Sequence, residues 1–321
     1  MKSHPASQGL SLRISVTDRC QLRCGYCMPP EGVPLLGRDE ILSYEEITAL
    51  VACLQEEFGL TKVRITGGEP LVRPDIERLV AKLADLGIPD LALTTNGLHL
   101  AEMAPLLRRA GLRRVNVSLD SISHDTFRRL TGGGDLQAVL DGITTALDVG
   151  LRPLKLNTVV IRGVNDNELR DLVEFGLRRD CEVRFIELMP IGPGAPLSAN
   201  GFISSEAVQR SLSSHFTFHP LGMESGESAS RYSVVSAEGR RGTVGFISSC
   251  SAPFCGTCAR LRVTADGRLI GCLARDGGVP IRETLRAGDR TSIAAVVRRV
   301  LSGKTADRIF EQNMAMASIG G

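Results

Sequence analysis

The stretch Cys20-Gln-Leu-Arg-Cys24-Gly-Tyr-Cys27 brings three cysteines together in one short segment. It follows an apolar run, Leu12–Thr17, that predicts a β-strand. Three closely spaced thiolates can bind three irons of a cubane [4Fe–4S] cluster and leave the fourth iron open to another ligand. The alternatives are a zinc site completed by a distant residue, or unrelated buried cysteines. Zinc sites usually show paired Cys-x2-Cys or Cys/His knuckles, so the spacing favours an iron–sulfur cluster.

From these cysteines to about residue 190, apolar strand-like runs alternate with helical patterns. The further expected strands are Lys62–Thr66, Asp90–Thr95, Arg114–Ser118, Lys155–Ile161 and Glu182–Leu188. Helices are expected at Ser43–Phe58, Asp75–Leu86, Ala101–Ala110, Leu136–Val149 and Asn167–Arg178. Regular alternation of this kind predicts an α/β fold, with a parallel sheet and helical crossovers. Six such units could form a partial barrel, but the pattern alone does not separate that from an open doubly wound sheet.

The pattern changes near Pro190, which places the expected domain boundary between residues 1–190 and 191–321. Ile191–Gly201 is rich in Gly, Pro and small polar residues and is expected to be a loop. The later elements are a short helix, four strands and a last helix, expected at Ser204–Leu212, Arg231–Ser236, Thr243–Ile247, Leu261–Thr264, Arg268–Gly271 and Ser292–Ser302. This second region is therefore predicted to be an α+β extension.

Composition and charge narrow the class of function. Of the 321 residues, 43% are hydrophobic and 23% are charged, which is typical of a globular protein with a large core. The formal net charge of +2 gives no global basic field for nucleic acid or a membrane. No apolar run is long enough to span a bilayer, and Met1–Leu10 lacks a signal-peptide pattern, so we expect a cytoplasmic protein.

The chain has nine cysteines, and in a reducing compartment these argue against a disulfide framework. Six of them form two clusters whose spacing is better explained by metal binding. Cys53 lies on an apolar helical pattern and is expected to be a small buried hydrophobe, as is Cys181. The role of Cys250 is open, because it closely precedes the second cluster.

The second cluster is Cys255-x2-Cys258-x13-Cys272. A zinc ribbon would normally offer a fourth Cys or His nearby, but no histidine follows Phe246 and the nearest spare thiol is Cys250. Either Cys250 completes a four-thiolate structural site, or three thiolates hold another iron–sulfur cluster with an open iron. The spacing alone leaves these two interpretations nearly equal.

The Cys20–Cys27 segment, with the aromatic Tyr26 before its third cysteine, resembles the signature of the radical S-adenosylmethionine (SAM) superfamily. The resemblance implies a partial (β/α)6 TIM-like barrel whose first loop holds a [4Fe–4S] cluster on Cys20, Cys24 and Cys27. It also implies that SAM binds the open iron and contacts Tyr26, Gly68, Ser118 and Met189. Gly68 belongs to Thr66-Gly-Gly-Glu-Pro70, where adjacent glycines would let a ligand approach the backbone closely.

Over essentially its whole length, the chain is similar to the GTP 3′,8-cyclase family of molybdenum cofactor biosynthesis. The matching segments are Leu12–Cys20, Arg64–Pro70, Leu93–Gly97, Arg184–Met189, Cys255–Arg262 and the terminal Gly320-Gly321. Gln21 and Leu22 depart from the residues that are frequent in the family, but neither is a cluster ligand. The resemblance implies a second [4Fe–4S] cluster on Cys255, Cys258 and Cys272, whose open iron binds the guanine of GTP.

The same resemblance implies contacts to GTP from Thr94 and from seven basic residues: Arg13, Lys62, Arg64, Lys155, Arg184, Arg260 and Arg262. A triphosphate needs convergent Arg and Lys donors, and basic residues inside a barrel are unfavourable unless an anion pairs with them. Residues two apart on a strand project to one face, as expected for Arg260 and Arg262. The Gly320-Gly321 tail would insert toward the active site, where glycine avoids crowding.

Together these resemblances imply a lyase that cyclises GTP to (8S)-3′,8-cyclo-7,8-dihydroguanosine 5′-triphosphate with SAM and two [4Fe–4S] clusters. They imply no catalytic side chain beyond the cluster ligands, cyclic pyranopterin monophosphate synthase as the downstream partner, an unspecified electron donor, and a homodimer as one assembly. One alternative is a radical SAM enzyme that modifies a peptide, although such enzymes usually carry more C-terminal cysteines. Another is a zinc-stabilised binding module without catalysis.

Overall fold

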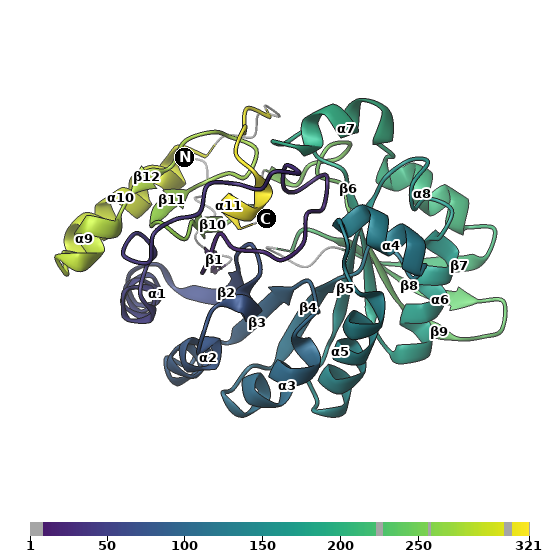
Figure 1. The fold of residues 1–321 in the computed structure, drawn as a ribbon, viewed down its shortest axis with the longest axis horizontal. Coiled ribbons are helices and arrows are strands. Elements are labelled where there is room, and N and C mark those ends of the chain that lie inside the picture. The colour runs from purple at the N-terminus through teal and green to yellow at the C-terminus, as the bar shows by residue number, and fades with distance from the viewer. Residues whose placement is uncertain (1–8, 223–226, 256–257, 305–309, 321) are drawn as a thin grey trace.

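The computed structural model describes residues 9–222, 227–255, 258–304 and 310–320. Its framework is one sheet with the strand order β12-β11-β10-β1-β2-β3-β4-β5-β6-β9-β8-β7. The middle strands β1 to β6 are parallel and neighbour one another in sequence order. Figure 1 shows this sheet curving, with helices along its outer side.

The parallel strands are β1 (Leu10–Ser15), β2 (Leu60–Thr66), β3 (Asp90–Thr95), β4 (Arg114–Ser118), β5 (Lys155–Val160) and β6 (Glu182–Glu187). The helices between them are α1 (Tyr44–Phe58), η2 (Pro70–Val72), α2 (Ile76–Asp85), α3 (Leu100–Arg109), α4 (His124–Thr131), α5 (Leu136–Asp148) and α6 (Leu169–Arg179). α1 shows why these boundaries hold: Ser43 and Glu46 form a capping box, and Gly59 ends the helix with φ 62°. The predicted series of parallel βα units is confirmed.

The chain beyond β6 extends both edges of this sheet. Its strands are β7 (Phe216–Gly222), β8 (Ser230–Ser236), β9 (Arg241–Ile247), β10 (Arg260–Val263), β11 (Arg268–Ile270) and β12 (Val279–Pro280). β9 joins β6 in parallel and continues into the antiparallel β8 and β7. β10 joins β1 in parallel and continues into the antiparallel β11 and β12. The C-terminal region therefore shares the barrel sheet, and a domain boundary at residue 190 stays a prediction.

The later helices are α7 (Gly194–Gly201), α8 (Ser205–Leu212), α9 (Arg282–Arg286), α10 (Arg290–Ser302) and α11 (Met316–Ile319). The predicted loop over Ile191–Gly201 is wrong in its second part, which forms α7. The small residues there allow close packing: a Cβ on Gly201 would lie 3.0 Å from Ile161, and one on Gly194 would lie 3.1 Å from Tyr26 O. The sequence analysis also missed β7, an edge strand that tolerates Pro220.

The hydrophobic core lies between the sheet and its outer helices. Strand residues that do not pack into this core point to the inner face of the curved sheet. On β1, Leu12 and Ile14 are wholly buried in this core, so the alternate residue Arg13 points to the inner face. Cys53 and Cys181 are buried in the same core, which confirms the expectation for both. No helix among the described residues has both the length and the apolar character to cross a membrane.

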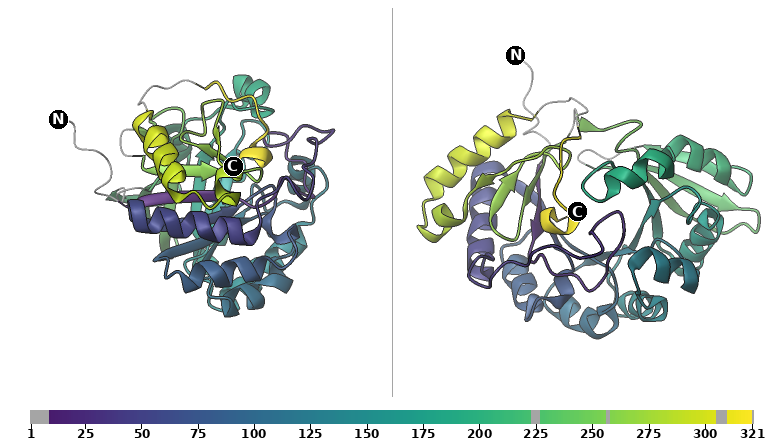
Figure 2. Two further views of the ribbon diagram at one scale, coloured as in Figure 1. Left: turned by 90° about the vertical axis from the view of Figure 1, so that its left-hand side faces the viewer. Right: turned by 45° about the horizontal axis from the view of Figure 1, so that its top comes forward.

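The C-terminal segment returns to the inner side of the curved sheet. Figures 1 and 2 both show α11 there, beside the loop that follows β1. The Met316 N–H donates to Cys27 O at 3.0 Å, which fixes α11 to that loop. The C-terminal segment therefore lies against the loop that carries Cys20, Cys24 and Cys27.

Candidate functional site

The first triplet, Cys20, Cys24 and Cys27, lies in the loop between β1 and α1, at the carboxyl ends of the parallel strands. All three thiols are free and partly exposed. The Cys27 N–H donates to Cys24 O at 2.8 Å, so these two cysteines share one turn. The side-chain amide of Asn96, after β3, lies 3.8 Å from the Cys20 sulfur. Active sites of barrel enzymes lie at this face.

The turn after β2 holds the start of the cysteine loop. The Gly68 N–H donates to Thr17 O and the Glu69 N–H donates to Arg19 O, both at 2.7 Å. A Cβ on Gly68 would lie only 2.5 Å from Arg19 O, so glycine is required for this approach. The adjacent glycines predict a ligand close to this backbone, whereas in the structure the chain's own loop lies there. A SAM contact at Gly68 stays a prediction.

Burial raises the pKa of all three thiols of the first triplet. The pKa of Cys24 lies well above its ordinary value, and that of Cys27 rises to about 12. After burial, the charge of Asp120 and the neighbouring thiolates contribute to the shift of Cys24, so the three sulfurs are electrostatic neighbours. The cluster-free thiols are therefore protonated at neutral pH, and cluster binding must release their protons.

Glu69 is a buried acid that sequence reasoning missed, although it stands in the Thr66–Pro70 motif. Its carboxylate accepts hydrogen bonds from Thr95 Oγ1 at 2.7 Å, Asn96 N at 2.6 Å and Leu71 N at 3.0 Å. Burial raises the pKa of Glu69 to about 7, and these hydrogen bonds oppose the shift. Glu69 therefore connects the ends of β2 and β3 beside the first triplet.

Tyr26 is held by a second buried acid. Its hydroxyl donates to Asp120 Oδ2 at 2.6 Å, and Asp120 Oδ1 accepts from Val159 N at 2.8 Å. Asp120 lies two residues after the end of β4, a position that was an unused sequence signal for a site residue. Ser118 ends β4 and Met189 follows β6, so the predicted SAM contacts all lie at the same end of the barrel.

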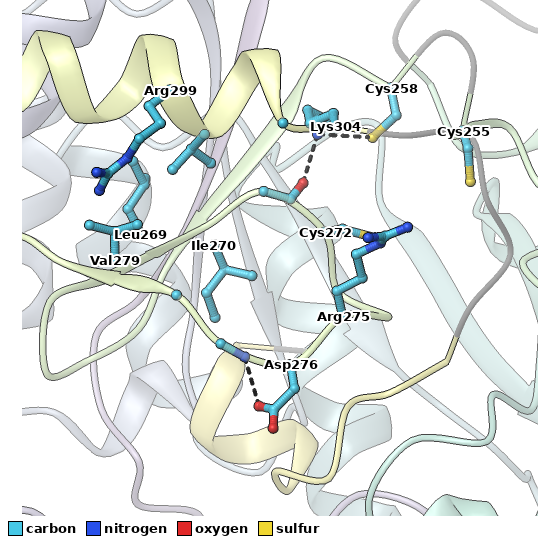
Figure 3. A pocket seen from close by; sticks show the side chains of 15 residues that line it. Cys255, Cys258, Leu269, Ile270, Cys272, Arg275, Asp276, Val279, Arg299 and Lys304 are labelled. Atoms are coloured by element: carbon cyan, nitrogen blue, oxygen red, sulfur yellow. Dashed lines mark hydrogen bonds between the residues drawn. The ribbon is translucent and has the colours of Figure 1, made fainter.

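The second triplet, Cys255, Cys258 and Cys272, lies between two cavities and lines both. The outer cavity has a volume of about 300 Å³ and is the one in Figure 3. The inner cavity, of about 120 Å³, also reaches Met189 and Arg262. The second triplet is thus joined by one cavity to residues predicted for SAM and for GTP.

Lys304 connects the two strand ends that carry this triplet. Its ammonium group donates to Arg260 O at 2.6 Å, to Gly271 O at 2.7 Å and to the Cys258 sulfur at 3.7 Å. Figure 3 shows it directed toward Cys258, with Cys272 on the neighbouring segment. Burial opposes the thiolate of Cys258, but the charges of Lys304 and Arg260 lower its pKa on balance. Sequence analysis assigned no role to the segment that contains Lys304.

Cys250 points elsewhere and borders neither cavity in the described part of the chain. Its thiol lies 3.7 Å from Leu188 O, and its N–H donates to Glu187 Oε2 at 2.8 Å. Glu187, at the end of β6, also accepts from the N–H groups of Ser205 and Ser251. This acid therefore anchors the segment that leads to the second triplet, and the geometry favours three thiolates over the four-thiolate alternative.

The two triplets fit cubane clusters. Within the described ranges, no three Cys, His, Asp or Glu side chains converge as one metal ion would require. In a cubane each thiolate binds a different iron, so its ligands need not converge on one point. Each triplet offers three free thiols, the donor set for a [4Fe–4S] cluster with one open iron.

A row of arginines crosses the inner face of the sheet. Arg13 on β1 is in register with Arg262 on β10 and with Arg64 on β2. Burial, and then the charges of neighbouring arginines, lower the pKa of all three. The Nε of Arg64 is buried without a hydrogen-bond partner among the described residues. Arg262 is buried and Arg13 and Arg64 are half-buried, so positive charge gathered here favours an anionic ligand.

A small cavity of about 20 Å³ collects most of the other predicted GTP contacts. It is lined by six basic and two acidic residues: Arg13, Lys62, Arg64, Arg114, Arg184, Arg260, Asp90 and Glu227. Lys155 lies beside this set, because its ammonium group is 3.9 Å from Glu182, the neighbour of Arg184. Thr94 Oγ1 accepts from the Asn116 side chain at 3.0 Å. Sequence reasoning missed Arg114, which pairs with Asp90, two residues before its register partner Ala92 on β3.

The C-terminal tail reaches this basic region. Arg262 Nη1 donates to Gly320 O at 2.6 Å, in a buried contact. Gly320 has φ 70°, a conformation that favours glycine. The predicted insertion of the tail is supported at Gly320, whereas Gly321 lies outside the described residues.

Comparisons with known proteins agree with this geometry. The Radical SAM superfamily matches residues 14–176, and Molybdenum Cofactor Synthesis C matches residues 181–310. The protein named GTP 3′,8-cyclase from Moorella thermoacetica is 44% identical over 317 residues, 97% of each chain. Its namesake from Geobacter sulfurreducens is 43% identical over 97% of this chain and 96% of its own. The chain belongs to the GTP 3′,8-cyclase family of the radical SAM superfamily. Membership of this family gives it SAM and two [4Fe–4S] clusters as cofactors.

Solved structures confirm the fold of this GTP 3′,8-cyclase family member. SuiB from Streptococcus suis, bound to precursor peptide SuiA, matches with a TM-score of 0.66 and 14% identity, over 94% of this chain and 68% of its own. SuiB bound to S-adenosylmethionine matches with a TM-score of 0.61 and 16% identity, over 86% of this chain and 64% of its own. At this identity the similarity concerns the fold alone, and it agrees with a partial TIM-like barrel.

Proposed function

We propose that the protein converts GTP into (8S)-3′,8-cyclo-7,8-dihydroguanosine 5′-triphosphate, the first step of molybdenum cofactor biosynthesis. Relatives named for this activity match almost the whole chain. The observation that carries the choice of substrate is the row of Arg13, Arg64 and Arg262 on the inner face of the sheet, because this charge calls for a strongly anionic ligand. Arg262 borders the same cavity as the second triplet, so the anion would lie beside it.

The first triplet would hold the cluster that binds SAM, with Tyr26, Gly68, Ser118 and Met189 as further contacts. The hydrogen bond from the Tyr26 hydroxyl to Asp120 would fix the tyrosine ring. When bound, this cluster and SAM would supply the radical chemistry that joins C3′ of GTP to C8, with methionine and 5′-deoxyadenosine released from SAM and the reducing electrons supplied by a separate donor.

The second triplet would hold the cluster whose open iron takes the guanine. Phosphate and nucleotide contacts would come from Thr94 and the basic set Arg13, Lys62, Arg64, Lys155, Arg184, Arg260 and Arg262. These residues would fix the triphosphate, so that the ribose and guanine keep one orientation during ring closure. The tail at Gly320-Gly321, held by Arg262, would help to exclude water from the site.

The downstream enzyme, the location in the cell and the assembly state are also proposed from the family resemblance. The product would pass to cyclic pyranopterin monophosphate synthase, and the protein would act in the cytoplasm, with a homodimer as one assembly and without nucleic acid or membrane partners. A separate electron donor would supply the reducing electrons.

One experiment separates this function from its alternatives. The protein is purified without oxygen, its iron is measured, and it is incubated with dithionite, SAM and GTP. About two cubanes per chain and GTP-dependent formation of 5′-deoxyadenosine and the dihydro product are expected. A protein that holds only zinc would be a binding module. Formation of 5′-deoxyadenosine without consumption of GTP would indicate the peptide-modifying alternative.

A further inference from the structure

Glu227 brings a negative charge into the basic cavity from outside the barrel strands. It lies between β7 and β8, and its side chain is only 13% exposed. Glu227 Oε2 accepts from Arg184 Nη2 at 3.0 Å, and its Oε1 lies 4.0 Å from Lys62 Nζ. Burial favours the neutral acid, but Arg184, Lys155 and Lys62 lower the pKa of Glu227 to about 2. The carboxylate is therefore anionic at physiological pH.

The cavity beside Glu227 is narrow in this arrangement. Its volume is only about 20 Å³, and Glu227 itself lines it. Two nitrogens of Arg184 already have carboxylate partners, Nε with Glu182 and Nη2 with Glu227. A phosphate group that binds Nε or Nη2 of Arg184 must therefore replace one of these anions.

The other acids of this region are less able to leave. Asp90 and Glu182 are the first residues of the barrel strands β3 and β6. Asp90 also forms a two-pronged pair with Arg114, at 2.7 and 2.6 Å. The backbone of both acids is fixed in a parallel strand, whereas Glu227 belongs to a connection between two strands at the edge of the sheet.

We propose that Glu227 is an internal counter-ion that occupies a phosphate position of the substrate site and is displaced when the triphosphate binds. This inference rests on the proposed function, because it takes GTP as the ligand. Glu227 neutralises part of the buried positive charge while no nucleotide is bound. GTP binding then exchanges one anion for another, so Glu227 sets the affinity for the substrate.

The test is calorimetric titration of the anaerobic holoenzyme with GTP and, separately, with inorganic triphosphate. Glu227→Gln keeps the size of the side chain and removes the competing charge, and it is expected to bind both ligands about tenfold more tightly. The matched control is Glu238→Gln, which removes a negative charge from an exposed pair with Arg240. The control is expected to bind both ligands as the wild type does.

Unchanged or weaker binding by Glu227→Gln overturns the inference, and weaker binding would mean that Glu227 assists the triphosphate. Iron content and thermal unfolding check that the variant is folded. If Glu227→Gln does not fold, Glu227→Asp keeps the charge but shortens the reach to Arg184, and it is expected to bind more tightly by a smaller factor. A wild-type protein that binds neither ligand contradicts the proposed function itself.

Discussion

Each of the two cysteine triplets offers three thiols, but the charged groups around the first are acidic and those around the second are basic. Burial and then acidic neighbours, Asp120 for Cys24 and Glu69 for Cys20, raise the thiol pKa values of the first triplet. At the second triplet the charge of Lys304 outweighs burial and lowers the pKa of Cys258. The groups beside the triplets agree with the proposed assignment of the two ligands: Asp120 and Glu69 lie by the first triplet, and Lys304 lies by the second. The sulfonium of SAM suits the acidic surroundings of the first triplet, and the triphosphate of GTP suits the basic surroundings of the second.

The largest effects should come from removing one ligand of each triplet. Cys24→Ala is expected to reduce 5′-deoxyadenosine formation more than about 100-fold, because a lost ligand should exceed the effect of losing an outer-shell partner. Cys258→Ala is expected to lose the dihydro product but to keep the GTP-independent level of 5′-deoxyadenosine formation, which Cys24→Ala should lose. Iron analysis and mass spectrometry of both products measure the two outcomes.

Cys53→Ala, at a buried cysteine outside both triplets, controls for general destabilisation of the core. It should leave the iron content at the wild-type level. If Cys24→Ala and Cys258→Ala instead had the same product pattern, the division of labour between the triplets would be wrong.

The next effect concerns the basic residues beside the second triplet. Arg260→Ala combined with Arg262→Ala is expected to keep both clusters but to weaken GTP binding by roughly 10- to 100-fold, since charge-assisted contacts to phosphate are lost. SAM binding should hardly change. Calorimetry with each ligand measures this, with Arg298→Ala as a control, because Arg298 pairs with Glu57 on the exposed surface. Equal losses for SAM and GTP would contradict the proposed separation of charge.

A substitution at Lys304 tests the electrostatic difference between the two triplets by changing the charge beside the second cluster alone. Lys304→Met removes the donor to the Cys258 sulfur and to two carbonyl groups. Hydrogen bonds and nearby positive charge stabilise the reduced cluster, so its reduction potential is expected to fall by on the order of 60 mV. Redox titration followed by electron paramagnetic resonance resolves the two clusters. Lys304→Arg should restore part of the potential, and a shift confined to the first cluster would refute the assignment.

The first triplet was predictable because its parts are local in sequence. The three cysteines share one loop, and the Thr66–Pro70 turn follows one βα unit later, so strand order alone brings them together. The arginine row could not be predicted from local sequence patterns, because it depends on the register of β10 against β1. That pairing joins Arg262 to Arg13 across almost the whole chain. The resemblance to the GTP 3′,8-cyclase family predicted these arginines, whereas the spacing of residues in the sequence could not have brought them together.

The acids around both sites were missed for a physical reason. Asp120, Glu69 and Glu187 act through hydrogen bonds to backbone groups of other strands and loops, and no periodic pattern encodes such contacts. Glu227 is similar, since only the folded sheet brings it to Arg184. The error at Ile191–Gly201 has another origin: the small residues that let α7 pack closely have the composition of a loop.

The smallest expected effect is a pH dependence confined to the GTP side. Burial, and then the charge of Arg184, lower the pKa of Lys155 to about 8. As the pH rises from 7 to 9, Lys155 loses its proton and its attraction for phosphate, so GTP binding should weaken a few-fold. Lys155→Arg stays charged over this range and should lack the decline. Titration of GTP and SAM at each pH checks this. A parallel decline for both ligands in the wild type would mean that the pH effect is not specific to the basic site.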